Sequence, residues 1–296
     1  MMNLFKDARD YQIICLGLFL VLGIFLRDWT LQINSILLII ITCLVTQIIL
    51  SSFLKFNSEF ININFKKKQG FYLNNLLDFS GVKSALITGL GLSLLLRANS
   101  SNILMLAGFL AISSKFIFNY HQKHFFNPAN FGIIITIFLT KSAWVSPGQW
   151  GSDWWYLLLF ICVGAMVLNK VGRWETSAIF LSVFIALEGI YNYYLGWNFE
   201  VLTHQLTSGS LLVFTFFMLT DPRSIPNAKN SRILWAIAIA FLSFILKEVF
   251  YINSGIFLAL FMMSPLTILL DLIWKENRFC WQKKQCNILV LLSSFS

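Results

Sequence analysis

The stretch LQINSILLIIITCLVTQIILSSFL, residues 31–54, decides the fold class, because it contains no Asp, Glu, Lys or Arg. A helix that crosses a bilayer needs about 20 predominantly apolar residues, and this stretch meets that requirement. The whole chain has the same character, since 57% of its 296 residues are hydrophobic and only 12% are charged. Soluble domains carry about 25% charged residues. The composition therefore excludes a soluble domain, a disordered chain and a disulfide mini-protein, and predicts an all-α integral membrane protein.

Ten apolar runs approach the length of a membrane-spanning helix. They are approximately residues 11–26, 31–54, 82–98, 102–118, 127–143, 155–170, 174–192, 208–220, 232–250 and 254–274. We therefore predict about ten transmembrane helices in one polytopic membrane domain, residues 1–296, with a cytoplasmic tail at residues 275–296. The first run lacks the small-residue cleavage site of a signal peptide, so we expect it to be a retained helix.

The positive charges predict the orientation of the chain in the membrane. The formal net charge is +9, from 22 Lys and Arg against 13 Asp and Glu. When the loops are assigned alternately to two sides, every Lys and Arg except Arg27, Arg97, Lys141 and Lys247 falls on one side. Cytoplasmic loops of membrane proteins are enriched in cations. We therefore predict that both termini are cytoplasmic, and that the basic residues face the lipid bilayer and cytoplasm rather than nucleic acid.

A weak internal repeat predicts two inverted halves. Ser80-Gly81 opens the third run and Ser208-Gly209 opens the eighth, while asparagine-containing segments open the fifth and tenth. Because each copy holds five helices, an odd number, the second copy would be inverted in the membrane. Inverted repeats place binding sites near the midplane between the halves. The predicted half-repeats are approximately residues 11–143 and 155–274.

Three motifs on the predicted cytoplasmic side carry polar residues. Asn127 and Pro128 suit the start of a helix, whose exposed amides also attract anions. Glu175 stands in the first turn of another helix, where the helix dipole favours a carboxylate. Asp221 precedes a helix-ending proline, and Arg223 follows it, placed to pair with Asp221 or to contact a phosphate. We predict that these residues line one ion or head-group site; the alternative is that each only stabilises its own helix end.

Ionisable residues also stand at run ends on the opposite side: Arg97, Glu188, Lys247 and Glu248. Long side chains in such positions usually extend to water. Glu188 is the best candidate for an acid within the membrane, because its side chain cannot reach as far as that of lysine. The five cysteines form no disulfide framework or four-cysteine metal motif, and we predict no metal site. Sequence signatures of nucleotide-binding and hydrolytic enzymes are absent.

Residues 126–129 (FNPA), 175–178 (ETSA) and 216–222 (FFMLTDP) resemble motifs of the RnfD/NqrB family and come in the same order. The last run, with Pro265 and Asp271, is also similar to the family's last helix, so the resemblance covers about residues 80–275. Members are ten-helix subunits of Rnf and sodium-translocating NADH:quinone oxidoreductase complexes, with a fold like urea and ammonium transporters. The resemblance implies a bacterial inner-membrane subunit that serves electron transfer coupled to ion transport, with other membrane subunits as partners.

We predict that a cofactor binds among the polar residues of these motifs on the cytoplasmic side. The candidate residues for a non-covalent flavin or quinone are Asn127, Asn130, Glu175, Asp221 and Arg223.

Covalent attachment of flavin in this family depends on a different motif. Respiratory members carry flavin mononucleotide on the Thr of an outer Ser-Gly-Ala-Thr motif. This chain has no such motif, and the corresponding loop reads WVSPGQWG at residues 144–151, so we predict no covalent flavin. The alternatives are a small-solute transporter or channel on the same fold, and a cofactor-free structural membrane partner.

Overall fold

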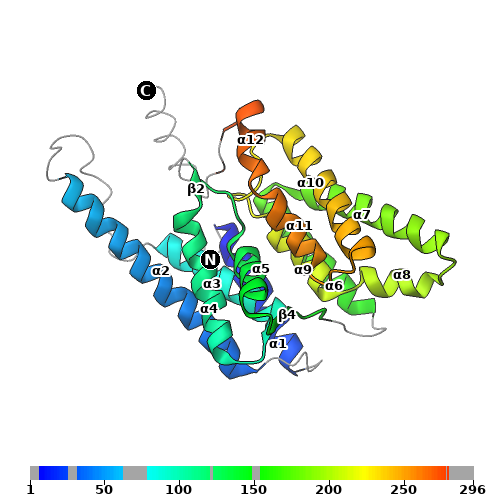
Figure 1. Cartoon of the computed structure of the whole chain (residues 1–296), viewed down its shortest axis with the longest axis horizontal. Helices are drawn as coiled ribbons and strands as arrows, with labels where there is room; N and C mark the ends of the chain where they lie inside the picture. The colour runs from blue at the N-terminus through cyan, green and yellow to red at the C-terminus, as the bar shows by residue number, and fades with distance from the viewer. Residues whose placement is uncertain are drawn as a thin grey trace, which may run out of the picture.

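The computed structural model describes residues 7–25, 32–62, 79–120, 123–148, 154–277 and 279 (Figure 1). Most of the predicted cytoplasmic tail, residues 278 and 280–296, lies outside the described residues. The first helices are α1 (Ala8–Phe25), α2 (Ile33–Asn62), α3 (Phe79–Leu95), α4 (Ser101–Ile117), α5 (Pro128–Thr140) and α6 (Trp154–Val171). They are followed by α7 (Trp174–Tyr194), α8 (Phe199–Leu206), α9 (Gly209–Val213), α10 (Lys229–Phe244), α11 (Gly255–Met263) and α12 (Leu266–Ile273). The π-helical segments η1 (Phe214–Met218) and η2 (Ile245–Val249) continue α9 and α10.

Each predicted apolar run contains helix, which confirms an all-α membrane protein. By length and composition, α1, residues 33–54 of α2, and α7 qualify as membrane spans. Two bent pairs raise the number to five among the described residues: α8 with α9–η1, at 49°, and α11 with α12, at 46°. Pro265 explains the second bend, because proline cannot continue the hydrogen-bond ladder of a helix.

Helix α2 presents an apolar stripe on the outside of the molecule. Ile33, Leu37, Ile41 and Val45, one residue per turn, are all more than two-fifths exposed. Side chains four residues apart share one helix face. Such a stripe suits lipid, in which exposed apolar side chains carry no penalty.

Small residues bring the N-terminal helices close together. A Cβ added at Gly132 of α5 would lie 2.7 Å from the Cβ of Ala111 and 2.8 Å from the carbonyl oxygen of Ala107, both in α4. Close backbone approach at small residues is the usual way for helices to pack in membranes. The α4–α5 contact therefore depends on a residue without a side chain at position 132.

Helices α7 and α10 run parallel and lie side by side (Figure 1). Glu175 near the start of α7 pairs with Arg232 near the start of α10, and Glu188 pairs with Lys247 in η2. At 1.5 Å of rise per residue, the two pairs are separated by roughly 20 Å along the helices. We call these two places the Arg232 end and the Lys247 end.

Two short antiparallel strand pairs join the helices: β1 (Leu96–Ala98) with β4 (Ala143–Val145), and β2 (Asn119–Tyr120) with β3 (Lys123–His124). After β4, backbone hydrogen bonds hold residues 146–148 between the end of α3 and the start of α9. The N–H of Ser146 donates to the carbonyl of Leu95 at 2.8 Å, and the carbonyls of Pro147 and Gly148 accept from the start of α9. The strands were not predicted, because residues 96–98 continue an apolar run.

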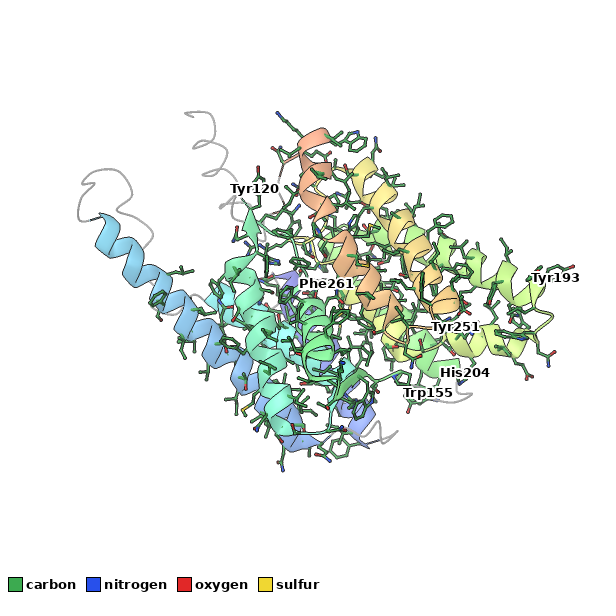
Figure 2. All side chains as sticks on the ribbon, in the orientation of Figure 1. Tyr120, Trp155, Tyr193, His204, Tyr251 and Phe261 are labelled. Atoms are coloured by element: carbon green, nitrogen blue, oxygen red, sulfur yellow. The ribbon has the colours of Figure 1, made fainter. Side chains whose placement is uncertain are left out.

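Aromatic side chains surround the Lys247 end. Tyr193 lies at the end of α7, Tyr251 follows η2 and His204 lies in the last turn of α8, all of them away from Tyr120 on β2 (Figure 2). Tyr193 and Tyr251 are 88% and 78% exposed. Exposed tyrosines are enriched at membrane–water interfaces, so this end has the composition of an interfacial region.

Candidate functional site

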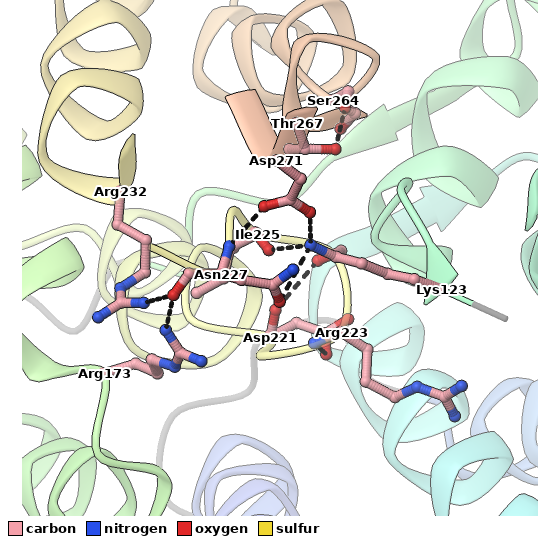
Figure 3. Close-up of polar contacts among 11 residues, drawn as sticks. Lys123, Arg173, Asp221, Arg223, Ile225, Asn227, Arg232, Ser264, Thr267 and Asp271 are labelled. Atoms are coloured by element: carbon pink, nitrogen blue, oxygen red, sulfur yellow. Dashed lines mark hydrogen bonds and ion pairs between the residues drawn. The ribbon is translucent and has the colours of Figure 1, made fainter. Parts of the chain in front are cut away.

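A buried ion pair fixes the Arg232 end. Oε1 of Glu175 accepts from Nε of Arg232 at 3.0 Å and also from its terminal nitrogen. Arg232 and Arg173 both donate to the carbonyl of Asn227, Arg173 at 2.9 Å (Figure 3). Burial lowers the pKa of Arg173 from its ordinary value. One carboxylate and one carbonyl thus hold two guanidinium groups, a geometry for which arginine's planar fork is suited.

A second ion pair holds the segment between η1 and α10, residues 219–228. Nζ of Lys123 lies 2.5 Å from Asp271 Oδ2 and donates to the carbonyl of Ile225 at 2.7 Å (Figure 3). The other oxygen of Asp271 accepts from the N–H of Asn227 at 2.7 Å. Residues from β3, from α12 and from the segment itself therefore share one network. Its effect is to fix the segment that carries Asp221 and Arg223.

A cavity of about 230 Å³ lies beside this segment, and Asn127, Asp221 and Arg223 line it together with Lys115 and His124. Three of the five predicted site residues are thus placed around one space. Pockets that enclose drug-sized ligands have volumes of about 300–1,000 Å³. The cavity is therefore of a size for a ring system or a head group, and too small for a dinucleotide.

Asn127 caps the start of α5, as predicted, and also connects α5 to η1. Its Oδ1 accepts from the N–H of Asn130 at 3.1 Å, and its Nδ2 donates to the carbonyl of Met218 at 3.3 Å. Pro128 occupies the first position of α5, as predicted. Asn130 does not line the cavity; its Nδ2 donates to the carbonyl of Phe257 at 3.0 Å and ties α5 to α11. Glu175 does not line the cavity either.

His124 contributes a neutral acceptor to the cavity. Burial lowers the pKa of His124 to about 4, although the nearby Asp221 carboxylate opposes this. Nδ1 lies 3.0 Å from the carbonyl oxygen of Phe126, which assigns the proton to Nδ1 and leaves Nε2 as an acceptor. The ring is therefore uncharged at neutral pH.

Asp221 and Arg223 form a tight turn at the edge of the cavity. Oδ1 of Asp221 accepts from the backbone N–H of Arg223 at 3.2 Å, as in an Asx turn. The Arg223 side chain extends away from the Lys123–Asp271 pair (Figure 3). The turn thus separates a fixed structural network from residues that face the cavity.

Residues 144–280 match the NQR2, RnfD, RnfE family. This match confirms the resemblance to RnfD/NqrB-like membrane subunits over that segment, which holds both ends of the α7–α10 pair. No curated protein matches the chain.

The candidate site has neighbours that the sequence motifs did not predict. Arg232 and Asn227 complete the Glu175 pair, and Lys123, which precedes the segment, holds Asp271. A signal was available, because Arg232 begins an apolar run in which a buried cation needs a carboxylate partner. Within the described residues, no three His, Cys, Asp or Glu side chains gather as metal ligands.

Proposed function

We propose that the chain is an integral membrane subunit of an Rnf- or Nqr-type complex, in which it serves electron transfer coupled to ion transport. The observation that carries the proposal is the family match over residues 144–280. The buried ion pairs within that segment support it, because ionisable groups inside membrane proteins are costly and usually functional. The partners are the bilayer and other membrane subunits of the complex.

The proposed topology has ten spans in two inverted five-helix halves, with both termini in the cytoplasm of a bacterial inner membrane. It is supported by the helix in each apolar run and by the cation asymmetry of the loops. The test uses a variant without native cysteines, with Cys placed at one of two exposed positions. Tyr193→Cys should react with an impermeant thiol reagent on intact cells, whereas Lys229→Cys should react only after permeabilisation. The reverse pattern would show that the orientation is wrong.

The proposed ligand of the cavity is the ring of a non-covalent flavin or quinone. The residues present fit such a ring. Oε1 of Gln47, a cavity residue, is buried and has no hydrogen-bond partner among the described residues, so a ring N–H or hydroxyl donor would satisfy it. Nε2 of His124 is a second acceptor, and Asn127, Asp221 and Arg223 would orient the ring. A bound flavin or quinone would supply the ability to accept and release electrons.

The absorbance spectrum of the purified full-length chain tests the cofactor proposal. We expect a flavin that stays in solution after acid precipitation of the protein, or a quinone that is extracted from the protein by organic solvent. Gln47→Leu should lower pigment content several-fold, whereas Glu200→Gln, at an exposed site on α8, should leave it unchanged. A colourless chain without quinone would contradict the proposal. A fluorescent band after full denaturation, lost in Ser146→Ala, would instead show covalent flavin.

A second candidate function is transport of a small solute without redox chemistry. The bent pairs α8/α9–η1 and α11/α12 favour it, because broken helices line the binding sites of many transporters. Solute flux into liposomes that contain only this chain would support this candidate. A colourless chain without flux that co-purifies with membrane neighbours would indicate a structural partner.

A further inference from the structure

The Lys247 end holds a buried cluster that lies outside the cavity described above. Nζ of Lys247 lies 2.8 Å from Oε1 of Glu188, 2.9 Å from Oε1 of Glu248 and 3.3 Å from Oε1 of Gln205. Three elements supply these groups: α7, η2 and α8. The two glutamates are only 2% and 9% exposed, whereas the lysine is 31% exposed.

The charges of this cluster do not balance. The ammonium of Lys247 has three N–H donors, and its three close contacts to Glu188, Glu248 and Gln205 account for all of them. With both carboxylates ionised, the cluster would carry one net negative charge in a buried place. An uncompensated buried charge is strongly unfavourable, and it is usually removed by binding a proton or a counter-ion.

Among the described residues, the charged groups that act on Glu188 are Lys247 and Glu248. His204 on α8 is a titratable residue that precedes Gln205 in the chain. The Lys247 ammonium also lies 5.7 Å from the centre of the Phe184 ring. Tyr191 on α7 and Tyr251 after η2 are titratable neighbours, but phenols are neutral at pH 7. Asn192, one turn beyond Glu188 on the same face of α7, has a buried Oδ1 without a partner in the described structure. This neighbourhood supplies acceptors rather than positive charge.

The adjacent residues Lys247 and Glu248 both lie in the π-helical segment η2. Segment η2 widens the turn at this point. Single π-turns inside helices occur frequently at functional sites.

We propose that Glu188 and Glu248 share one exchangeable proton, which makes the Lys247 end a proton-binding site. The proton comes from water and binds one carboxylate oxygen, and the other carboxylate accepts its hydrogen bond. The cluster then carries no net charge. On release the proton returns to water by way of the partly exposed Lys247 side. The proposal extends the proposed function by naming the proton as the ion at this site, but the site does not depend on a bound cofactor.

Infrared difference spectroscopy of the purified full-length chain tests the proposal. We expect a carboxylic C=O band at pH 7 that shifts on exchange into D₂O and is unaffected by NaCl. Glu188→Gln and Glu248→Gln should each abolish the band, because the remaining carboxylate is then balanced by Lys247. Glu200→Gln, which removes an exposed carboxylate from α8, should leave the band intact.

Three results would overturn the proposal: no band at pH 7, a band that survives both single variants, or a band that disappears on addition of NaCl. The last result would identify a sodium ion as the occupant. Circular dichroism of each variant shows whether it is folded. If Gln disrupts the fold at one position, the variant at the other position still tests the shared proton. Because the measurement needs no pigment, a colourless chain with the band would contradict the cofactor proposal and leave this one standing.

Discussion

The two ends of the α7–α10 pair combine hydrogen-bond donors and acceptors in opposite proportions. At the Arg232 end, the carboxylate of Glu175 accepts from Arg232, and the carbonyl of Asn227 accepts from both Arg232 and Arg173. Asp271 and Glu276 are further carboxylates that act on Arg173. At the Lys247 end, two carboxylates and one amide oxygen surround a single ammonium. Donors are in excess at the first end and acceptors at the second.

This difference separates a structural ion pair from an exchangeable one. A backbone carbonyl cannot leave or change its charge, so the surplus donors at the Arg232 end fix the segment that forms the cavity wall. A surplus carboxylate can be satisfied by a mobile proton. Removal of one negative charge should therefore destabilise the protein far more at the Arg232 end than at the Lys247 end.

The largest effect is expected for Glu175→Gln at the Arg232 end. The substitution leaves the buried guanidinium of Arg232 without its carboxylate partner, and breaking a buried pair in this way costs about 3–5 kcal/mol. We expect a marked fall in the midpoint of thermal unfolding in detergent. The comparison variant is Glu200→Gln, an exposed glutamate whose loss should change stability by less than about 0.5 kcal/mol. Equal midpoints for the two variants would show that the Arg232 end is not held by its ion pair.

Acidic pH is expected to lower the stability of the folded protein by a smaller amount, through protonation of His124, which lines the cavity. Burial lowers the pKa of His124 to about 4, from an ordinary value of 6.5. The unfolded chain therefore binds the proton first, and stability is lost as the pH falls from 6.5 to 4. The loss amounts to about 3 kcal/mol. His124→Gln should remove this contribution.

The measurement compares unfolding midpoints of the wild type and His124→Gln at pH 7 and pH 4. Other carboxylates titrate in both proteins, so only the difference between them reports on the imidazole. Identical pH profiles would mean that the imidazole is already charged or exposed in the folded protein.

Much of this architecture was predictable from local sequence. Asn127 and Pro128 begin α5 as capping rules predict, and Glu175 stands in the first turn of α7. The apolar runs located the helices, because hydrophobic length is a local property. Helix α8 was missed, since it is short and contains Glu200 and His204.

The pairing of charges was not predictable from local sequence. Glu175 and Arg232 stand 57 positions apart, and their contact depends on the parallel packing of α7 against α10. Lys247 was expected to extend to water, but it lies between two glutamates instead. Local rules treat each side chain alone, whereas the net charge of a buried cluster is a property of the tertiary structure.

The smallest effect is expected for Glu248→Gln at the Lys247 end, and it gives the sharpest contrast between the two ends. The substitution removes the surplus negative charge but keeps an oxygen that accepts from Lys247, so the pair with Glu188 remains complete. We expect the free energy of unfolding at pH 7 to change by less than about 1 kcal/mol, because no buried charge is left unpaired.

The wild-type cluster must bind a proton to reach the same balance, so its stability should decrease relative to the variant as the pH rises above neutral. Unfolding midpoints of both proteins at pH 7 and pH 9 measure this divergence. A loss in Glu248→Gln as large as that in Glu175→Gln would mean that both carboxylates of the Lys247 end are ionised and needed, and the two ends would then be equivalent.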